Sequence, residues 1–189
     1  MHETALARRP PLEAVQPLTG PTVTLAALPP CARWVFRGRP AAVAAIAVPL
    51  GFALPQIACR AANAGARAAL WLGPDEWLIL APDAKGPAIG LAFANALAGL
   101  PHALVYVSHR QAGMSLSGVH AEATLNAGCP LDLDPQSFPV GMCTRTVLGK
   151  SQIVLWRVSE HEFRFEASRS FLSYIWRFLE EASREFRDA

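Results

Sequence analysis

The sequence has little charge of either sign. Its 189 residues include 17 Lys plus Arg and 15 Asp plus Glu, which gives a formal net charge of +2. These residues are dispersed along the chain, so no basic patch indicates nucleic-acid binding. Lysine is scarce, with only Lys85 and Lys150, and arginine supplies nearly all the positive charge. Arginine suits bidentate pairing at protein interfaces, although genome composition explains the same bias.

The signatures of a metal site or a disulfide framework are also missing. The cysteines lie far apart, with no C-x-x-C pair and no histidine at ligand spacing: Cys31, Cys59, Cys129 and Cys143. We therefore expect no zinc or iron–sulfur site. The N-terminus does not look like a secretion signal, because Arg8-Arg9 is followed by prolines and not by an apolar core. Reduced thiols in a cytoplasmic protein are the expectation.

Membrane spans and common cofactor motifs are absent from the sequence as well. The most apolar stretch, residues 41–58, is interrupted by Pro49, Gly51 and Pro55, so we do not expect it to cross a bilayer. The sequence has no G-x-G-x-x-G opening a helix after a strand, no G-x-x-x-x-G-K-[ST], no G-x-S-x-G and no H-E-x-x-H. We therefore predict no catalytic, cofactor-binding or metal-binding residues in this chain.

One polar pair stands where a predicted strand ends. His109-Arg110 follows the apolar run of residues 103–107. The Arg110 guanidinium has the geometry to clamp a carboxylate. A lone arginine at a strand end also serves as a surface residue or as a structural ion-pair partner. The sequence leaves both interpretations open.

Apolar residues are plentiful. The composition is 52% hydrophobic with a mean hydropathy of +0.23, which suffices to bury a core. Residues 1–20 are proline-rich and lack periodicity, so we predict an arm without a core of its own, either a tail or a segment that lies along a neighbour. Residues 21–189 are predicted to form a single α+β domain, with halves at about 21–100 and 101–189.

A tight hairpin is predicted at Gly73-Pro74-Asp75-Glu76. Pro74 presets the backbone for the second position of a turn, and Asp75 suits the third. Apolar residues 70–72 and 77–80 flank the turn and favour two strands. Before this hairpin we predict a strand at 33–37, a helix at 41–48 that stops before Pro49, and an irregular stretch to residue 66. After it we predict a helix at 86–100.

The second half repeats this order of elements. Strands are predicted at 103–107 and 113–117, a helix from 118 to 128, and strands at 144–148, 153–158 and 162–166. Leu155-Trp156 followed by Glu162-Phe163 mirrors Leu70-Trp71 followed by Glu76-Trp77, with one residue more in between. We interpret the two halves as a diverged duplication of a β-rich α+β unit.

The final helix is predicted at about 169–186. One stripe carries its apolar residues: Phe171, Leu172, Ile175, Phe178, Leu179, Ala182 and Phe186. Tyr174 and Trp176 lie on opposite flanks of that stripe, and we predict them as candidate interface residues. They either cover the core of this chain or meet another subunit, where Tyr and Trp are favoured.

Several of these stretches resemble known families. Leu72-Gly73-Pro74-Asp75-Glu76-Trp77-Leu78 looks like the signature turn of sarcosine oxidase gamma subunits, and residues 128–133, 138–146 and 169–171 are similar to the same family. Tyr106-Val107-Ser108-His109, with the strand and helix after it, resembles the Asp-Val-Ser-His block of glycine-cleavage aminomethyltransferases. In those enzymes the aspartate is the key acid/base near the folate, and Tyr106 holds its place here. The likeness covers residues 22–186.

The resemblance implies a folate-binding, aminomethyltransferase-like fold and a non-catalytic role. Complexes of this family contain four different subunits and oxidatively demethylate sarcosine to glycine, forming hydrogen peroxide and, with tetrahydrofolate, methylene-tetrahydrofolate. The flavins and the nicotinamide nucleotide (NAD) are expected in the large subunits and zinc in the smallest. This chain is expected to carry no cofactor, while tetrahydrofolate could bind within the complex. Its expected partners are the other subunits, chiefly the large subunit with an aminomethyltransferase-like domain, with neither nucleic acid nor membrane.

A second interpretation is a stand-alone tetrahydrofolate-binding or aminomethyltransferase-like protein of the same fold. Tyr106 in the place of the aspartate, with no second candidate acid near it, favours the structural subunit. In isolation the chain could pair with itself as a homodimer through its apolar surface.

Overall fold

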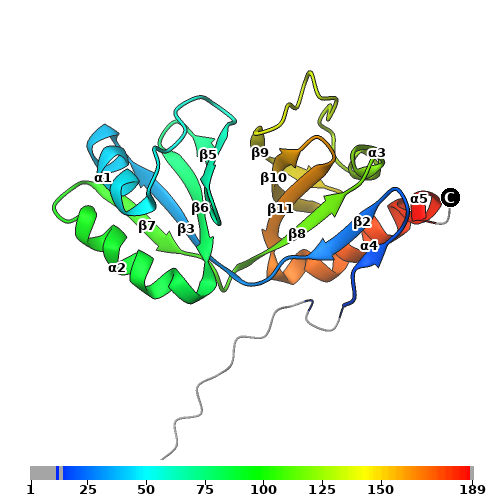
Figure 1. The fold of residues 1–189 in the computed structure, drawn as a ribbon, viewed down its shortest axis with the longest axis horizontal. Coiled ribbons are helices and arrows are strands. Elements are labelled where there is room, and N and C mark those ends of the chain that lie inside the picture. Colours follow the sequence, from blue (N-terminus) through cyan, green and yellow to red (C-terminus); the bar gives the residue numbers. More distant parts are fainter. Residues whose placement is uncertain (1–11, 13–14, 188–189) are drawn as a thin grey trace, which may run out of the picture.

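The computed structural model describes residue 12 and residues 15–187. In this part of the chain two antiparallel sheets face each other, and helices lie on the outer side of each sheet (Figure 1). None of its helices is long and apolar enough to span a membrane. The α+β class predicted from the sequence is confirmed.

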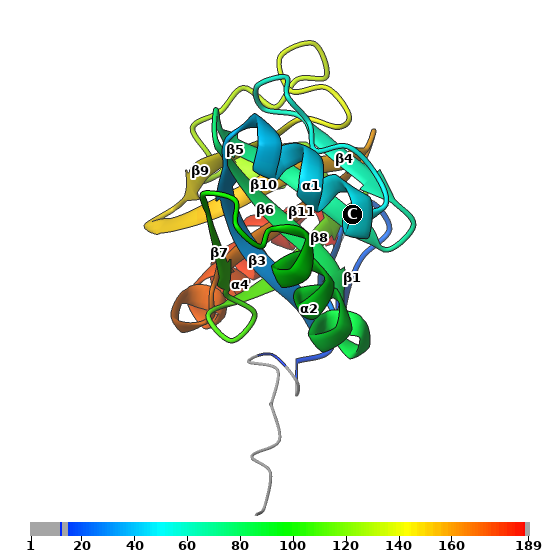
Figure 2. The ribbon, with the colours of Figure 1, turned by 90° about the vertical axis from the view of Figure 1, so that its left-hand side faces the viewer.

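The first sheet has five strands in the order β4-β5-β6-β3-β7. Helices α1 and α2 cover its outer face, where they bury Trp34, Phe36 and Trp77 (Figure 2). The bounds of its elements are β3 (Cys31–Gly38), α1 (Pro40–Leu50), β4 (Ala61–Ala64), β5 (Arg67–Gly73), β6 (Glu76–Pro82), the 3-10 helix η1 (Asp83–Lys85), α2 (Gly86–Ala96) and β7 (His102–Tyr106).

The second sheet has six strands in the order β1-β2-β8-β11-β10-β9. Helices α3 and α4 pack on its outer face around Leu116, Phe163 and Phe165. The bounds of its elements are β1 (Leu18–Thr19), β2 (Thr24–Ala27), β8 (Gln111–Ser117), α3 (Ala121–Asn126), β9 (Cys143–Leu148), β10 (Ser151–Ser159), β11 (Glu162–Ser168), the 3-10 helix η2 (Arg169–Phe171), α4 (Leu172–Ala182) and α5 (Arg184–Arg187).

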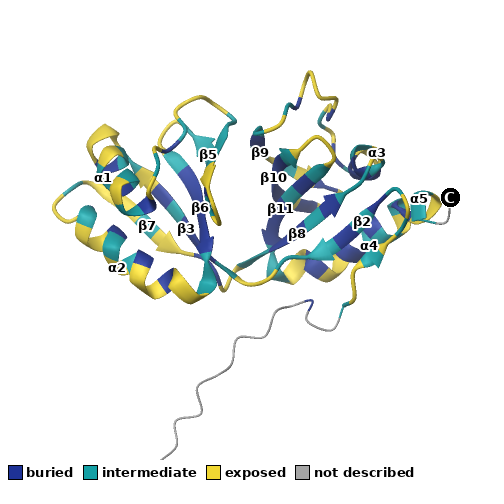
Figure 3. Cartoon of the chain, in the orientation of Figure 1, coloured by how far each residue is buried: buried dark blue, intermediate teal, exposed yellow. Residues whose placement is uncertain are grey.

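A third apolar cluster lies between the sheets. Its buried members come from β5 and β6 on one side and mainly from β9 and β10 on the other: Ala68, Leu70, Leu78, Leu80, Val107, Cys143, Val154 and Trp156. Successive strand residues point to opposite faces, so these strands are buried on both sides (Figure 3). This explains why residues 77–81 of β6 and 153–156 of β10 are continuously apolar and do not alternate.

The two sheets share one order of elements: strand, helix, three strands, 3-10 helix, helix. β6, η1 and α2 have 7, 3 and 11 residues, and β11, η2 and α4 have the same lengths. Each element of the second set begins 86 residues after its counterpart, as Glu162 does after Glu76. The hairpins match too, since the register shifts between Trp71 and Gly73 in one and between Arg157 and Ser159 in the other.

This offset corrects one detail of the predicted repeat. It equates Leu70 with Trp156, so the match of Leu70-Trp71 to Leu155-Trp156 is wrong by one residue. The predicted boundary near residue 100 is also wrong for the sheets. β7 lies beyond it and pairs with β3, while β2 lies before it and pairs with β8. The chain therefore crosses between the sheets twice, at residues 28–30 and 107–110.

The predicted hairpin is confirmed. Gly73 pairs with Glu76, which leaves Pro74 and Asp75 as the two-residue loop. Both oxygens of the Asp75 carboxylate accept hydrogen bonds from Arg37 Nη2 at 3.1 Å, and the Asp75 carbonyl accepts one from Gly38 N. These bonds fix the turn to β3, the neighbouring strand.

Several boundaries differ from the prediction. Helix α1 continues through Pro49, because a proline in the last turn removes only one backbone bond and Gly51, at φ 92°, caps the helix by donating to Ala47 O. The stretch expected to be irregular contains β4, a strand of small residues that pairs with β5. α2 ends at Ala96 and not at residue 100, and the predicted last helix is divided into η2, α4 and α5.

Most of the predicted arm lies outside the described residues. The part that the structure describes is not without partners. Leu12 is buried at 8% exposure, and Leu18–Thr19 forms β1 against β2. These positions of the predicted arm therefore pack against the domain that follows them, and the arm as a whole stays a prediction.

Candidate functional site

The crossing at residues 107–110 is a tight turn fastened to β3. Arg110 N donates to Val107 O at 2.9 Å, and Val107 N donates to Arg33 O at the same distance. The buried Ser108 Oγ accepts a hydrogen bond from Arg33 N at 2.7 Å. The Tyr-Val-Ser-His block noted in the sequence thus forms the connection between the sheets.

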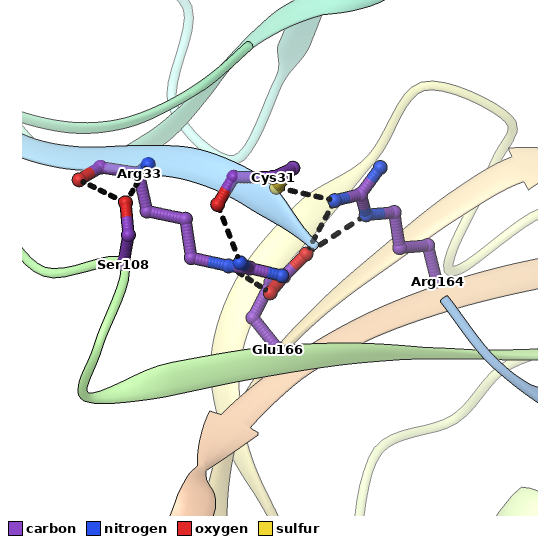
Figure 4. A network of polar contacts seen from close by, with 5 residues as sticks. All are labelled: Cys31, Arg33, Ser108, Arg164 and Glu166. Carbon is purple, nitrogen blue, oxygen red and sulfur yellow. Dashed lines mark hydrogen bonds and ion pairs between the residues drawn. The ribbon is translucent and has the colours of Figure 1, made fainter. Parts of the chain in front are cut away.

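A buried ion pair joins the sheets beside this turn. Arg33 Nε on β3 donates to Glu166 Oε2 on β11 at 2.6 Å, and both side chains are 1% exposed. Arg164 Nε and Nη2 donate to the other oxygen, Glu166 Oε1, at 2.9 and 2.7 Å. Arg33 Nη1 also donates to Cys31 O at 2.9 Å (Figure 4). Glu166 is therefore held between two arginines from opposite sheets.

The environment of this cluster shifts the pKa values of Arg164 and Cys31. Burial by itself would lower the pKa of Arg164, but the Glu166 carboxylate outweighs it and raises that pKa above the usual value. Burial, followed by the negative charge of Glu166, raises the pKa of the Cys31 thiol, although Arg33 and Arg164 oppose this. A thiol held in its protonated form is a poor nucleophile, so Cys31 is a structural member of the cluster.

Gly113 makes room for this cluster on β8. A Cβ at this position would lie 2.9 Å from Glu166 Oε1 and 3.2 Å from Arg33 Nη2. Beside Gly113 is a small pocket of about 40 Å³, whose lining includes Arg33 and Gln111. Arg33 Nη2 and Gln111 Oε1 have no hydrogen-bond partner within the described residues. A cavity of this size with one donor and one acceptor suits ordered water.

A larger cleft opens between the two sheets, with a volume of about 690 Å³. Val35 and Val105 line it from the first sheet, and residues of β9, β10 and β11 line it from the second. Two carboxylates face it, and each is already paired. Glu76 binds Arg145 across the cleft, and Glu166 belongs to the buried cluster.

The structure separates the predicted polar pair. Both side chains are exposed, but only Arg110 lines the cleft. The Arg110 guanidinium has neither an ion-pair nor a hydrogen-bond partner in the described part of the chain. Its backbone carbonyl accepts from Arg169 N at 3.0 Å. The carboxylate clamp, one of the two interpretations that the sequence leaves open for Arg110, therefore stays a prediction.

Tyr106, in the place of the aminomethyltransferase aspartate, lies on the other face of its strand. Its ring centroid is 5.4 Å from that of Trp34, whose side chain belongs to the core under α1 and α2. Tyr106 is not among the residues that line the cleft. The position thus supplies no acid to the space between the sheets.

The two aromatic residues predicted at an interface behave differently. Trp176 is 5% exposed and belongs to the core of the second sheet, which is the first of the two roles predicted for it. Tyr174 is 37% exposed, and its hydroxyl accepts from Lys150 N at 3.1 Å. Contact with the β9–β10 turn accounts for Tyr174 on one flank of the apolar arc of α4, and burial in the core accounts for Trp176 on the other.

Sequence reasoning missed the Arg33–Glu166 pair. The two residues are 133 positions apart, and no local spacing connects them. One signal was present, because aromatic residues occupy every second position of both segments and charged residues occupy the positions between and beside them, apart from Val35: Arg33-Trp34-Val35-Phe36-Arg37 and Glu162-Phe163-Arg164-Phe165-Glu166. Such alternation places charges on the face of a strand opposite its own helices, which here is the face between the sheets. Within the described residues no group of His, Cys, Asp and Glu could hold a metal ion.

Comparison with solved structures defines the class of this fold. Aminomethyltransferase T of the glycine cleavage system from Bartonella henselae matches 85% of this chain and 46% of its own length, with a TM-score of 0.65 and 15% identity. The chain therefore has the fold of part of an aminomethyltransferase. The family model described as sarcosine oxidase, gamma subunit family, matches residues 37–185. The chain belongs to this family.

Close relatives agree with this assignment. The sarcosine oxidase subunit gamma of Arthrobacter sp. is 36% identical over 144 residues, which cover 76% of this chain and 70% of the relative. The same subunit of Corynebacterium sp. strain U-96 is 33% identical over 147 residues, or 77% and 71% of the two chains. In the structure of heterotetrameric sarcosine oxidase from Corynebacterium sp. U-96 with pyrrole 2-carboxylate, one chain matches with a TM-score of 0.88 at 30% identity, covering 96% of this chain and 97% of that one.

Proposed function

We propose that this chain is the non-catalytic, structural gamma subunit of a heterotetrameric sarcosine oxidase in the cytoplasm. The complex oxidatively demethylates sarcosine to glycine, forms hydrogen peroxide and passes the one-carbon unit to tetrahydrofolate. The flavins, NAD and zinc belong to the other subunits. The main partner is the large subunit with an aminomethyltransferase-like domain.

The main support for this proposal is that the carboxylates that face the cleft are already bound to arginines. A general base must be free to take a proton from a substrate. Among the described residues that line the cleft, Glu76 is bound by Arg145, and Glu166 is bound by Arg33 and Arg164. These carboxylates join one sheet to the other, which is a structural task.

The test is to purify the chain alone and together with the other three subunits. The isolated chain should be colourless and should form no hydrogen peroxide from sarcosine, with or without tetrahydrofolate. Co-expressed, it should co-purify with the flavin-containing subunits and be required for a stable complex. A flavin spectrum or peroxide formation by the pure chain would contradict a non-catalytic role.

A stand-alone tetrahydrofolate-binding protein is the second candidate. The cleft of about 690 Å³ favours this alternative, as does Arg110 in its lining, whose guanidinium has no partner among the described residues. Calorimetric titration of the isolated chain with tetrahydrofolate separates the two. Saturable binding that is lost in Arg110→Ala would support the alternative, whereas no heat of binding would support the structural subunit.

We further propose that the two halves arose by duplication of one α+β unit. Equal element lengths at a constant offset of 86 residues support this, as do the corresponding register shifts of the two hairpins. Residues 21–189 then form one domain, preceded by the arm of residues 1–20. A sequence profile built from residues 61–96 of many family members should match residues 143–182 of the same sequences, and a failure to do so would contradict a common origin.

A further inference from the structure

The outer edge of β7 has no neighbouring strand in the part of the chain that the structure describes. β7 is the last strand of the five-stranded sheet and pairs only with β3 within the described residues (Figure 2). In an edge strand, alternate N–H and C=O groups point away from the sheet and can pair with another chain. Natural proteins block such edges with lysine, proline or bulges. The strand His-Ala-Leu-Val-Tyr has none of these, and its five pairs with β3 follow without a shift.

The second sheet shows what the same edge can hold. β2 occupies there the place that β7 occupies in the first sheet. In the second sheet, Leu25 of β2 pairs with Leu116, which pairs on its other side with Phe163. In the first sheet, Leu104 of β7 pairs with Phe36, which pairs on its other side with Trp77. Phe163 and Trp77 are equivalent residues of the two halves. β2 carries a further antiparallel strand, β1, through the pairs Leu18↔Leu25 and Thr19↔Thr24. A strand in the equivalent place of the first sheet would pair with Leu104 and Ala103 of β7. No segment of the described chain occupies that place.

The side chains of β7 indicate the chemistry of a strand that would lie there. Val105 is 53% exposed and lines the cleft, while Tyr106 is 45% exposed on the opposite face. Val147 of β9 also lines this cleft and is 38% exposed. A strand added to β7 with apolar residues on both faces would cover these side chains.

The free charge beside this edge points to an acidic partner. Arg110 lines the same cleft as Val105 and has no partner in the described part of the chain. A second copy of β7 does not supply one, because residues 98–110 contain neither Asp nor Glu. A different polypeptide with an acidic residue in an extended segment would supply both the added strand and the counter-charge for Arg110.

We propose that the outer edge of β7 binds an extended segment of a partner subunit as an additional strand, with an acidic side chain of that segment paired to Arg110. This inference rests on the proposed function, since it names the surface through which the chain joins the complex. Backbone hydrogen bonds supply affinity in this mode of recognition, and the flanking side chains supply specificity.

Hydrogen exchange of the isolated chain and of the purified complex tests the added strand directly. The amides of residues 102–106 that point outward should exchange at least about tenfold more slowly in the complex, since strand addition protects them. Equal exchange in both samples, in a complex that does assemble, would overturn the added strand and leave the structural role intact. If the chain does not assemble at all, the proposed function itself fails.

Two variants test the side chains. Val105→Glu and Arg110→Glu should each weaken assembly with the other subunits by about tenfold or more, because each places a negative charge next to the acidic segment. Val48→Glu is the matched control, since Val48 is an 82% exposed valine on the outer helix α1, and it should assemble like the wild type. Wild-type affinity for both test variants with unchanged thermal stability would overturn the proposal.

Two other occupants would also overturn it. If deletion of residues 1–11 speeds exchange at 102–106 in the isolated chain, the arm of this chain covers the edge. If the isolated chain is a dimer that Val105→Glu converts to a monomer, a second copy covers it.

Discussion

Arg33 and Glu166 lie on different sheets and meet with Nε and Oε2 2.6 Å apart, both almost completely buried. Two charges in the interior of a protein are tolerated only while they remain paired. If one of the two side chains is removed, the other is left as a buried charge without a partner. Glu166 neutralises two arginines at once, because Arg164 binds its second oxygen. The junction of the sheets therefore depends on one carboxylate.

Glu166→Gln should lower the free energy of unfolding by about 3–5 kcal/mol, because two buried or half-buried guanidinium groups lose their counter-charge. Urea denaturation followed by circular dichroism measures this. Asp75→Ala is the control. It breaks the Arg37–Asp75 pair, whose side chains are 56% and 54% exposed, and should cost less than about 1 kcal/mol. Equal costs for the two variants would show that the buried pair is not the main tie between the sheets.

Gly113→Ala should destabilise the protein by about 1–3 kcal/mol, since its Cβ would crowd Glu166 Oε1 at 2.9 Å. Gly90→Ala provides the matched comparison. A Cβ there meets only Trp34 at an ordinary 3.6 Å inside helix α2, so this change should stabilise by about 0.5–1 kcal/mol. Opposite signs in thermal denaturation would confirm the close approach at Gly113, and two stabilising changes would contradict it.

Trp176→Ala should cost about 3–5 kcal/mol, because its indole fills the core beneath α4. Tyr174→Phe should cost about 1 kcal/mol by removing the acceptor for Lys150 N. Urea unfolding curves of the wild type and both variants, fitted with a common m-value, measure the two losses of stability. If Trp176→Ala is as stable as the wild type and instead fails to bind the other subunits, the interface role assigned from the sequence would be restored.

Burial raises the pKa of the Cys143 thiol from 9.0 to about 12. The unfolded chain then loses this proton at lower pH than the folded chain. The contribution of Cys143 is fully present below pH 9.0 and is lost as the pH rises toward about 12. In this pH range the thiol alone should lower the free energy of unfolding by up to about 1.4 kcal/mol per pH unit.

Urea titrations at pH 8, 9 and 10 measure this dependence, and Cys143→Ala serves as the reference because other groups titrate in the same range. The difference in stability between the two proteins should shrink with rising pH. A constant difference would show that the thiol titrates normally.

The sequence predicted what local chemistry controls. The turn at Pro74-Asp75 follows from the residues that each turn position prefers, and the strands around it follow from their apolar runs. β4 was missed because Ala61-Ala62-Asn63-Ala64 has low β propensity and becomes a strand only on the edge that β5 offers. Pro49 was read as a stop, but in the last turn a proline costs the helix little.

The site was less predictable than the fold. Arg110 was singled out, and it does line the cleft. The role of Trp176 could not be decided from the sequence, because a helical pattern shows which face is apolar but not whether the chain's own core covers all of it. Glu166 could not be matched to Arg33, since the contact exists only after both sheets have formed.

The exchange of β2 and β7 between the sheets also bears on how the protein unfolds. A fragment ending at residue 100 would lack β7, and one beginning at residue 101 would lack β2, so each would expose the side of a central strand. The two sheets are nevertheless tied together, because the apolar cluster between them and the buried Arg33–Glu166 pair belong to both. We therefore expect them to melt in a single calorimetric transition, with equal van't Hoff and calorimetric enthalpies.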